Sequence, residues 1–126
     1  MKIQWIGKNV DLELLSNCIE IFFQNKTFNT SKELSNGQIK FSTIKNYDKN
    51  PLIIFITIGG DSKGFFVEIE CKNISDSLQK LSHFFTTMGL GPLLFKKLKL
   101  YEHYKEVEDE FCRYLEKVVS DLSHKA

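Results

Sequence analysis

The sequence predicts an α+β fold, in which an antiparallel sheet of four to five strands packs on helices. Apolar residues alternate with a period of two in several short segments between residues 38 and 71, whereas residues 10–24 and 91–122 show helical spacing. The predicted order is β-α-β-β-β-β-α plus a long C-terminal helix. A chain of 126 residues, 42% of them hydrophobic, is sufficient for one structural domain. Within it, residues 1–90 form the α+β part, and residues 91–126 form a helix packed on that part or on a second subunit.

The first three elements are a strand, a helix and a second strand. Residues 2–6 read as a short strand ended by Gly7. Residues 10–24 read as a helix, because four apolar residues recur at spacings of 3, 4 and 3: Leu12, Leu15, Ile19 and Phe22. Either Asn9 or Asp11 is placed to cap this helix. Residues 26–34 are polar, which is typical of a strand at a sheet edge.

Three further strands follow, joined by short turns. Asn36-Gly37 is a strong signal for a two-residue hairpin. After it come an alternating strand at 38–45 and a strand at 52–58 that is apolar on both faces, as a central strand is. The last strand, 65–71, alternates between two faces, with Phe65, Val67, Ile69 and Cys71 inward and Phe66, Glu68 and Glu70 outward.

Two helices complete the predicted order. Ser75 is placed to cap a helix that ends at Met88, because Gly89 follows as a suitable C-terminal residue. Pro92 is placed to begin the last helix, which runs to about Leu122.

In element order, residues 1–90 resemble the repeat unit of TATA-box-binding protein and small archaeal proteins of similar fold. Proteins of that fold that bind DNA do so with the open face of the sheet. Here the face carries Glu68 and Glu70 beside Phe66 and either Ile53 or Phe55. Because carboxylates repel phosphate, we do not predict that this protein shares the DNA binding of that fold. We expect the apolar residues of this face to be covered by the C-terminal helix or exposed as a binding patch.

The composition argues against several classes of function. The net charge is +1, and only one of the 17 basic residues, Arg113, is the arginine that bidentate phosphate and base contacts favour. No apolar run approaches the ~18 residues of a membrane span, and no signal peptide is recognisable at the start. Cys18, Cys71 and Cys112 are far apart, which indicates free thiols and a cytoplasmic location.

No motif in the sequence supports catalysis, a metal or a cofactor. The segment GGDSKG (59–64) lacks the spacing of a phosphate-binding loop and precedes a strand, and MGLGPL (88–93) reads as a helix-helix corner. His103, Glu106 and Glu110 share one helix face, but a metal site would need ligands from another helix, where His83 is the nearest histidine. We therefore predict a non-enzymatic protein without catalytic, metal-binding or cofactor-binding residues.

The C-terminal helix has an unusual charge distribution. Residues 93–105 carry four lysines against one glutamate, whereas residues 106–116 carry five acidic residues against one arginine. This arrangement opposes the helix dipole, so local helix stability does not explain it. About 30 helical residues span about 45 Å, longer than the ~25–30 Å width of such a domain. The helix must therefore overhang, bend or meet another chain.

We interpret this helix as an antiparallel dimer contact with a heptad seam. The predicted interface has apolar residues at spacings of 3 and 4: Tyr104, Val107, Phe111, Tyr114 and Val118. The basic segment, Lys96–Lys105, would face the acidic segment, Glu106–Glu116, of the second chain. The alternative is that the helix folds back over its own sheet.

The sequence thus favours an interaction or regulatory module that forms a homodimer through its C-terminal helix, with another protein as a further partner. One alternative is nucleic-acid binding, through lysines of the 40–49 hairpin and through Lys96, Lys97 and Lys99. The other is a small apolar ligand held between sheet and helices.

Overall fold

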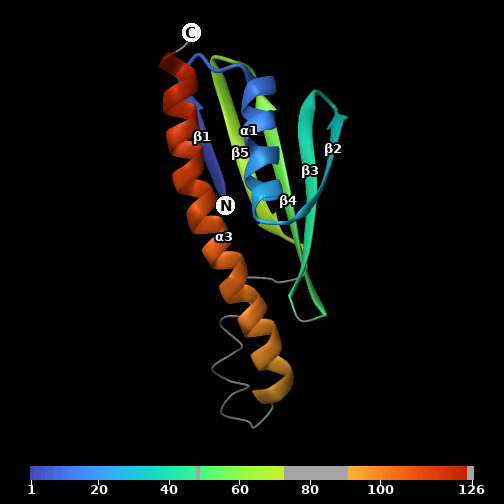
Figure 1. The fold of residues 1–126 in the computed structure, drawn as a ribbon. Coiled ribbons are helices and arrows are strands. Elements are labelled where there is room, and N and C mark those ends of the chain that lie inside the picture. Colours follow the sequence, from blue (N-terminus) through green and yellow to red (C-terminus); the bar gives the residue numbers. More distant parts are fainter. Residues whose placement is uncertain (48, 73–90, 125–126) are drawn as a thin grey trace.

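The structure is a computed structural model that describes residues 1–47, 49–72 and 91–124, with the backbone alone for 91–98 and 124. Within these residues, one antiparallel sheet carries two helices that lie side by side on the same face (Figure 1). The predicted α+β class and element order are confirmed. The helix expected at 75–88 and the side chain of His83 lie outside the described residues.

The sheet has five strands, and its spatial order differs from the chain order. The strands are β1 (Lys2–Ile6), β2 (Asn29–Ser35), β3 (Gln38–Tyr47), β4 (Asn50–Gly60) and β5 (Gly64–Cys71). They lie side by side in the order β1-β5-β4-β3-β2, so β4 is central and β1 and β2 are the edges. Helix α1 (Leu12–Asn25) connects one edge to the other, and helix α3 (Gly91–His124) lies beside it.

The ends of α1 have local causes in the sequence. Asp11 caps the N-terminus, because its Oδ1 accepts a hydrogen bond from the Glu13 N–H at 2.9 Å. At the C-terminus, Thr27 adopts a φ of 65° and the Phe28 N–H donates to the Phe23 carbonyl at 2.9 Å. This is the pattern of a Schellman motif, in which a β-branched residue occupies the position that favours glycine.

The β2–β3 hairpin confirms the Asn36-Gly37 signal. Both residues have a positive φ, 53° and 76°, as a two-residue turn of this twist requires. Ser35 therefore pairs with Gln38, which fixes the register of all following pairs. One of these is the pair of Glu33 and Lys40 on the face away from the helices.

The core lies between the helices and one face of the sheet. Alternate residues of the three inner strands point into it and are almost fully buried: Ile39, Phe41, Leu52, Ile54, Ile56, Ile58, Phe65, Val67 and Ile69. Helix α1 adds the face predicted from its periodicity, including Leu15, Ile19 and Phe22. Cys71, predicted to point inward, is half-buried.

Helix α3 packs on α1 and the sheet with a wider face than a heptad seam. The Phe111 ring lies 5.4 Å from that of Phe22 and 5.5 Å from that of Phe23. Leu115 and Val119 are also buried, although the seam prediction omitted both. The buried residues of α3 thus form a wider face than the predicted seam, as is typical of a helix that covers a core.

The length of α3 exceeds that of the sheet. Figure 1 shows its first turns projecting beyond the ends of the strands, whereas the part from Leu100 onward packs on the domain. The first turns of α3 therefore overhang the sheet, and the rest of the helix packs on the sheet of its own chain. Neither of the described helices is long and apolar enough to cross a membrane.

Candidate functional site

The structure places the predicted dimer seam in the core of its own chain. The buried members are Tyr104, Val107, Phe111 and Val118, none of which exceeds 9% exposure. The half-buried Tyr114 packs against Phe22 at 5.0 Å, and its hydroxyl donates to the Cys18 carbonyl at 2.8 Å. Because Tyr104, Val107, Phe111 and Val118 are buried in their own chain, these four side chains would reach a second chain only if α3 left the sheet.

The lysines predicted to contact nucleic acid are only partly described. Lys99 is exposed, and the side chains of Lys96 and Lys97 lie outside the described part of the chain. On the β3–β4 hairpin, Lys49 is exposed, whereas Lys45 donates to the Lys26 carbonyl at 2.9 Å. Nucleic-acid binding through these lysines stays a prediction.

Part of the charge distribution on α3 is used within the chain. Glu108 is buried and accepts hydrogen bonds from the Tyr104 hydroxyl at 2.7 Å and the Lys105 ammonium at 3.1 Å. The bond to Glu108 raises the pKa of Lys105. Glu110 pairs with Lys26 at the end of α1, and this bond lowers the pKa of the Glu110 carboxyl. Glu110 therefore links α3 to the end of α1, whereas the bonds of Glu108 stay within α3.

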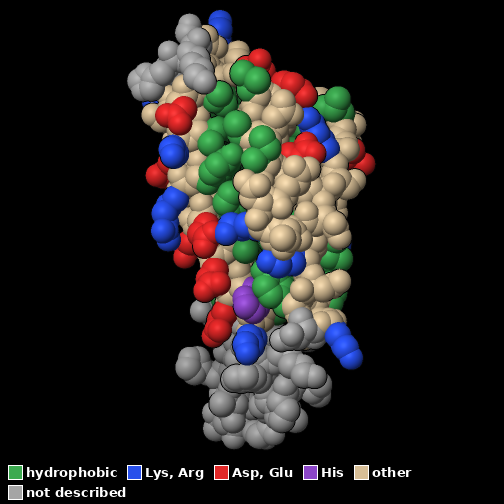
Figure 2. Space-filling view, viewed as in Figure 1, with side chains coloured by type: hydrophobic (Ala, Val, Ile, Leu, Met, Phe, Trp, Pro, Cys, Tyr) green, Lys and Arg blue, Asp and Glu red, His purple; other side chains and the backbone are tan. Residues whose placement is uncertain are grey.

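A polar cleft of about 450 Å³ lies where α1, β3 and α3 meet. Its lining consists of Asn25, Lys26, Thr27, Lys45, Tyr47, His103, Glu106, Val107 and Glu110. The rings of Tyr47 and His103 stack at 4.1 Å. Burial, followed by the charges of Glu106 and Glu110, raises the pKa of the Tyr47 hydroxyl. In Figure 2 the purple histidine side chain lies between acidic and basic side chains.

This cleft does not define a catalytic or metal site. Its His103, Glu106 and Glu110 come from one helix, as expected from the sequence, and no cluster of three metal-binding side chains occurs among the described residues. A second groove, of about 620 Å³, has a mixed lining of Asn9, Asp11, Leu12, Glu13, Leu14, Ser62 and Leu122.

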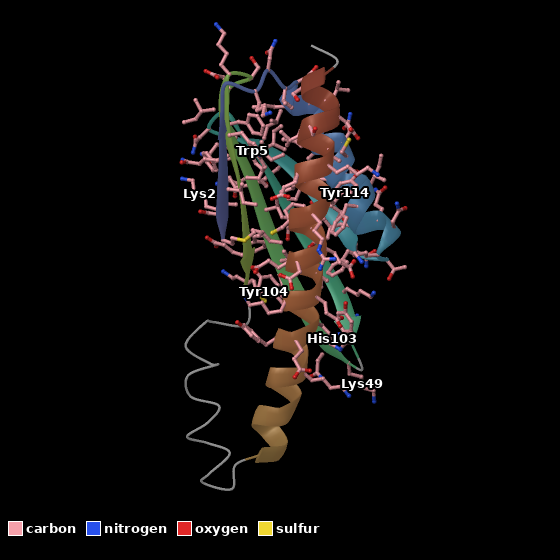
Figure 3. The ribbon with its side chains drawn as sticks, turned by 90° about the vertical axis from the view of Figure 1, so that its left-hand side faces the viewer. Lys2, Trp5, Lys49, His103, Tyr104 and Tyr114 are labelled. Carbon is pink, nitrogen blue, oxygen red and sulfur yellow. The ribbon has the colours of Figure 1, made fainter. Side chains whose placement is uncertain are left out.

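The second face of the sheet is the larger candidate surface. Both described helices lie on the opposite face, so α3 does not cover Ile53, Phe55 or Phe66. Figure 3 shows the two sides of β1, with Lys2 pointing away from α3 and Trp5 pointing toward it. Of the two outcomes predicted for this face, coverage by α3 does not occur, and exposure as a binding patch stays a prediction.

Aromatic rings on this open face are contacted by lysines. The Lys2 ammonium lies 4.2 Å from the centre of the Phe66 ring, and the Lys72 ammonium lies 5.5 Å from that of Phe55. The Phe66 ring covers Gly59, where an added Cβ would lie 2.5 Å from two ring atoms. The surface therefore combines aromatic rings, which are enriched at interfaces, with lysine side chains.

Sequence reasoning found the residues of β4 and β5 on this face but missed their neighbours. Lys2 pairs with Glu68 because β1 adds to β5, a contact between segments far apart in the chain. The pairing of Lys40 with Glu33 was accessible, because counting outward from the Asn36-Gly37 turn gives it directly.

The fold and the open face define a small α+β domain with a one-sided antiparallel sheet. A scan against protein-family models gives no match, and a search of curated proteins finds no significant similarity. The functional argument therefore depends on the surface itself.

Proposed function

We propose that this chain is a non-enzymatic interaction or regulatory module, and that the open face of its sheet is the binding surface. The observation that carries the proposal is the one-sided sheet, which leaves a whole face uncovered by either described helix. Sheets normally bury at least one face and expose polar residues on the other. Here the other face carries Phe55 and Phe66 together with Ile44, which is 38% exposed.

The proposal keeps the interaction role expected from the sequence and moves it from α3 to the sheet. The apolar residues of α3 from Leu100 onward already stabilise the core, so they are poor candidates for an interface. The TATA-box-binding-protein-like resemblance supports the use of an open sheet face, without its DNA ligand. A cytoplasmic location suits the free thiols of Cys18, Cys71 and Cys112.

The test compares variants of the open face with variants of the helix layer. Phe55→Arg places a charge on the open face, and Lys117→Glu changes an exposed residue of α3 as a control. We expect any partner that the wild type retains in a capture experiment to be lost with Phe55→Arg and kept with Lys117→Glu. A partner that Phe55→Arg retains at wild-type level would refute the proposed surface.

The nucleic-acid alternative has its own measurement. A gel-shift experiment over a range of salt concentrations would show binding that weakens steeply with salt if lysines contact phosphates. We expect no shift, because only one of the 17 basic residues is the arginine that phosphate and base contacts favour.

A further inference from the structure

The charged residues of the open face include a row that crosses all five strands. In the strand order β1-β5-β4-β3-β2, this charge row consists of Lys2, Glu68, Thr57, Lys40 and Glu33. Its charges run positive, negative, neutral, positive and negative. If the row is read in the opposite direction, from β2 to β1, each charged position carries the opposite charge. Thr57, on the central strand, keeps its place in the middle.

No ion pair within the described chain uses the charge row. The ion pairs found among the described residues lie on the helix side of the sheet: Lys26–Glu110, Lys32–Glu13 and Lys105–Glu108. Lys2 contacts the Phe66 ring, although Glu68 is its neighbour across the strands. The charges of the row are therefore available to an external partner.

We propose that this partner is a second copy of the chain, stacked face to face about a two-fold axis parallel to β4. This inference rests on the proposed function of the open face. The rotation reverses the order of the strands across the interface, so Lys40 faces Glu68 of the second copy and Glu68 faces its Lys40. Lys2 and Glu33 are matched in the same way at the two edges, and Thr57 meets its own counterpart.

The charge row also selects the direction of the axis. A two-fold axis along the row would set each residue against its own counterpart, so that Lys2 would face Lys2 and Glu68 would face Glu68. Like charges in direct opposition are destabilising. The arrangement of charges thus favours the axis parallel to β4 over the axis perpendicular to it.

The strip along the axis is uncharged. The outward residues of β4 include Ile53, Phe55 and Thr57, which can approach their counterparts as two sheets stacked about 10 Å apart do. Because twisted sheets pack at about −30°, the inner pairs of Lys40 and Glu68 should match better than the outer ones.

The size of the face predicts a reversible dimer. The 8 residues of β5 extend about 26 Å and five strands span about 24 Å, which gives a footprint of about 600 Å² for each copy. The total of about 1,200 Å² is at the lower end for specific interfaces.

Charge reversal of the inner pair tests the proposal. Lys40→Glu places two glutamates opposite each other in a homodimer, and Glu68→Lys places two lysines opposite each other. We expect each variant to raise the dimer dissociation constant at least about ten-fold in sedimentation experiments. An equal mixture of the two variants restores both opposite-charge pairs, so we expect it to form a heterodimer of near wild-type affinity.

The controls distinguish this dimer from one formed through α3 and from a folding defect. Lys117→Glu and Glu116→Lys make the same charge changes on exposed positions of α3 and should leave the dissociation constant unchanged. Equal thermal midpoints for all single variants would show that folding is intact. Recovery in the mixture is a result that a folding defect does not give.

Two outcomes would overturn the proposal. One is a dimer that the α3 variants weaken and the Lys40 and Glu68 variants do not. The other is a wild type that stays monomeric to about 200 µM, well above micromolar dissociation constants. The second result excludes the second copy as partner, while the capture experiment with Phe55→Arg still decides whether the open face binds another protein.

Discussion

Replacement of Phe111 is the sharpest test of where α3 packs. This side chain is fully buried, between the rings of Phe22 at 5.4 Å and Phe23 at 5.5 Å. Phe111→Ala removes these contacts and leaves a cavity, which typically lowers the free energy of unfolding by about 3–5 kcal/mol. With a urea slope of about 2 kcal/mol per molar, the unfolding midpoint should fall by about 2 M.

The assay is urea unfolding followed by circular dichroism at low protein concentration, so that dissociation does not contribute. Glu116→Ala is the matched control, because it truncates an exposed side chain on the same helix and should change stability by less than about 0.5 kcal/mol. Phe111→Asp should unfold the chain, since it buries a charge in the core. A folded Phe111→Asp monomer with a wild-type midpoint would refute the intramolecular packing and favour the dimer seam.

Other perturbations test local features of the fold. Thr27→Gly removes the strain of a left-handed residue, about 1–2 kcal/mol, against a chain-entropy cost of about 0.5–1 kcal/mol, so the thermal midpoint should rise; a fall would contradict the strain. Tyr104→Phe removes a hydrogen bond to the buried Glu108 carboxylate and should cost about 1.5–3 kcal/mol in urea unfolding, whereas no loss would mean that water replaces the hydroxyl. Burial raises the pKa of Tyr47 and Tyr114 above 10.0, so the stability they contribute is present below about pH 10 and is lost as the pH rises through the folded-state values. Thermal unfolding at increasing pH should show this decline, and a flat profile to about pH 11 would contradict it.

The elements of the fold were predictable because their signals are local. Alternation and helical spacing act over a few residues, and the Asn36-Gly37 turn specifies its own hairpin. The central position of β4 followed from its two apolar faces, and the polar character of β2 predicted an edge strand. These inferences needed no knowledge of which distant segments meet.

Most of the features that the sequence analysis missed depend on distant contacts. The order β1-β5-β4-β3-β2 places Lys2 beside Glu68, and no short-range pattern encodes that pairing. The same holds for Lys26, which reaches Glu110 on α3. The width of the α3 core face was accessible, because Leu115 and Val119 continue the spacing of four from Phe111. The predicted dimer seam left out both residues, because it admitted only positions at alternating spacings of 3 and 4.

A close contact between Gly59 and Phe66 on the open face can be tested by a double-mutant cycle. A Cβ at position 59 would lie 2.5 Å from two atoms of the Phe66 ring, so Gly59→Ala must displace a ring that also contacts Lys2. We expect this variant to be destabilised in the wild-type background. In a Phe66→Ala background the Cβ has room, and alanine should then stabilise the strand by about 0.5–1 kcal/mol relative to glycine. The two substitutions should therefore be coupled by more than about 0.5 kcal/mol, measured from urea unfolding of the four proteins. Additive effects would mean that the Phe66 ring does not cover Gly59.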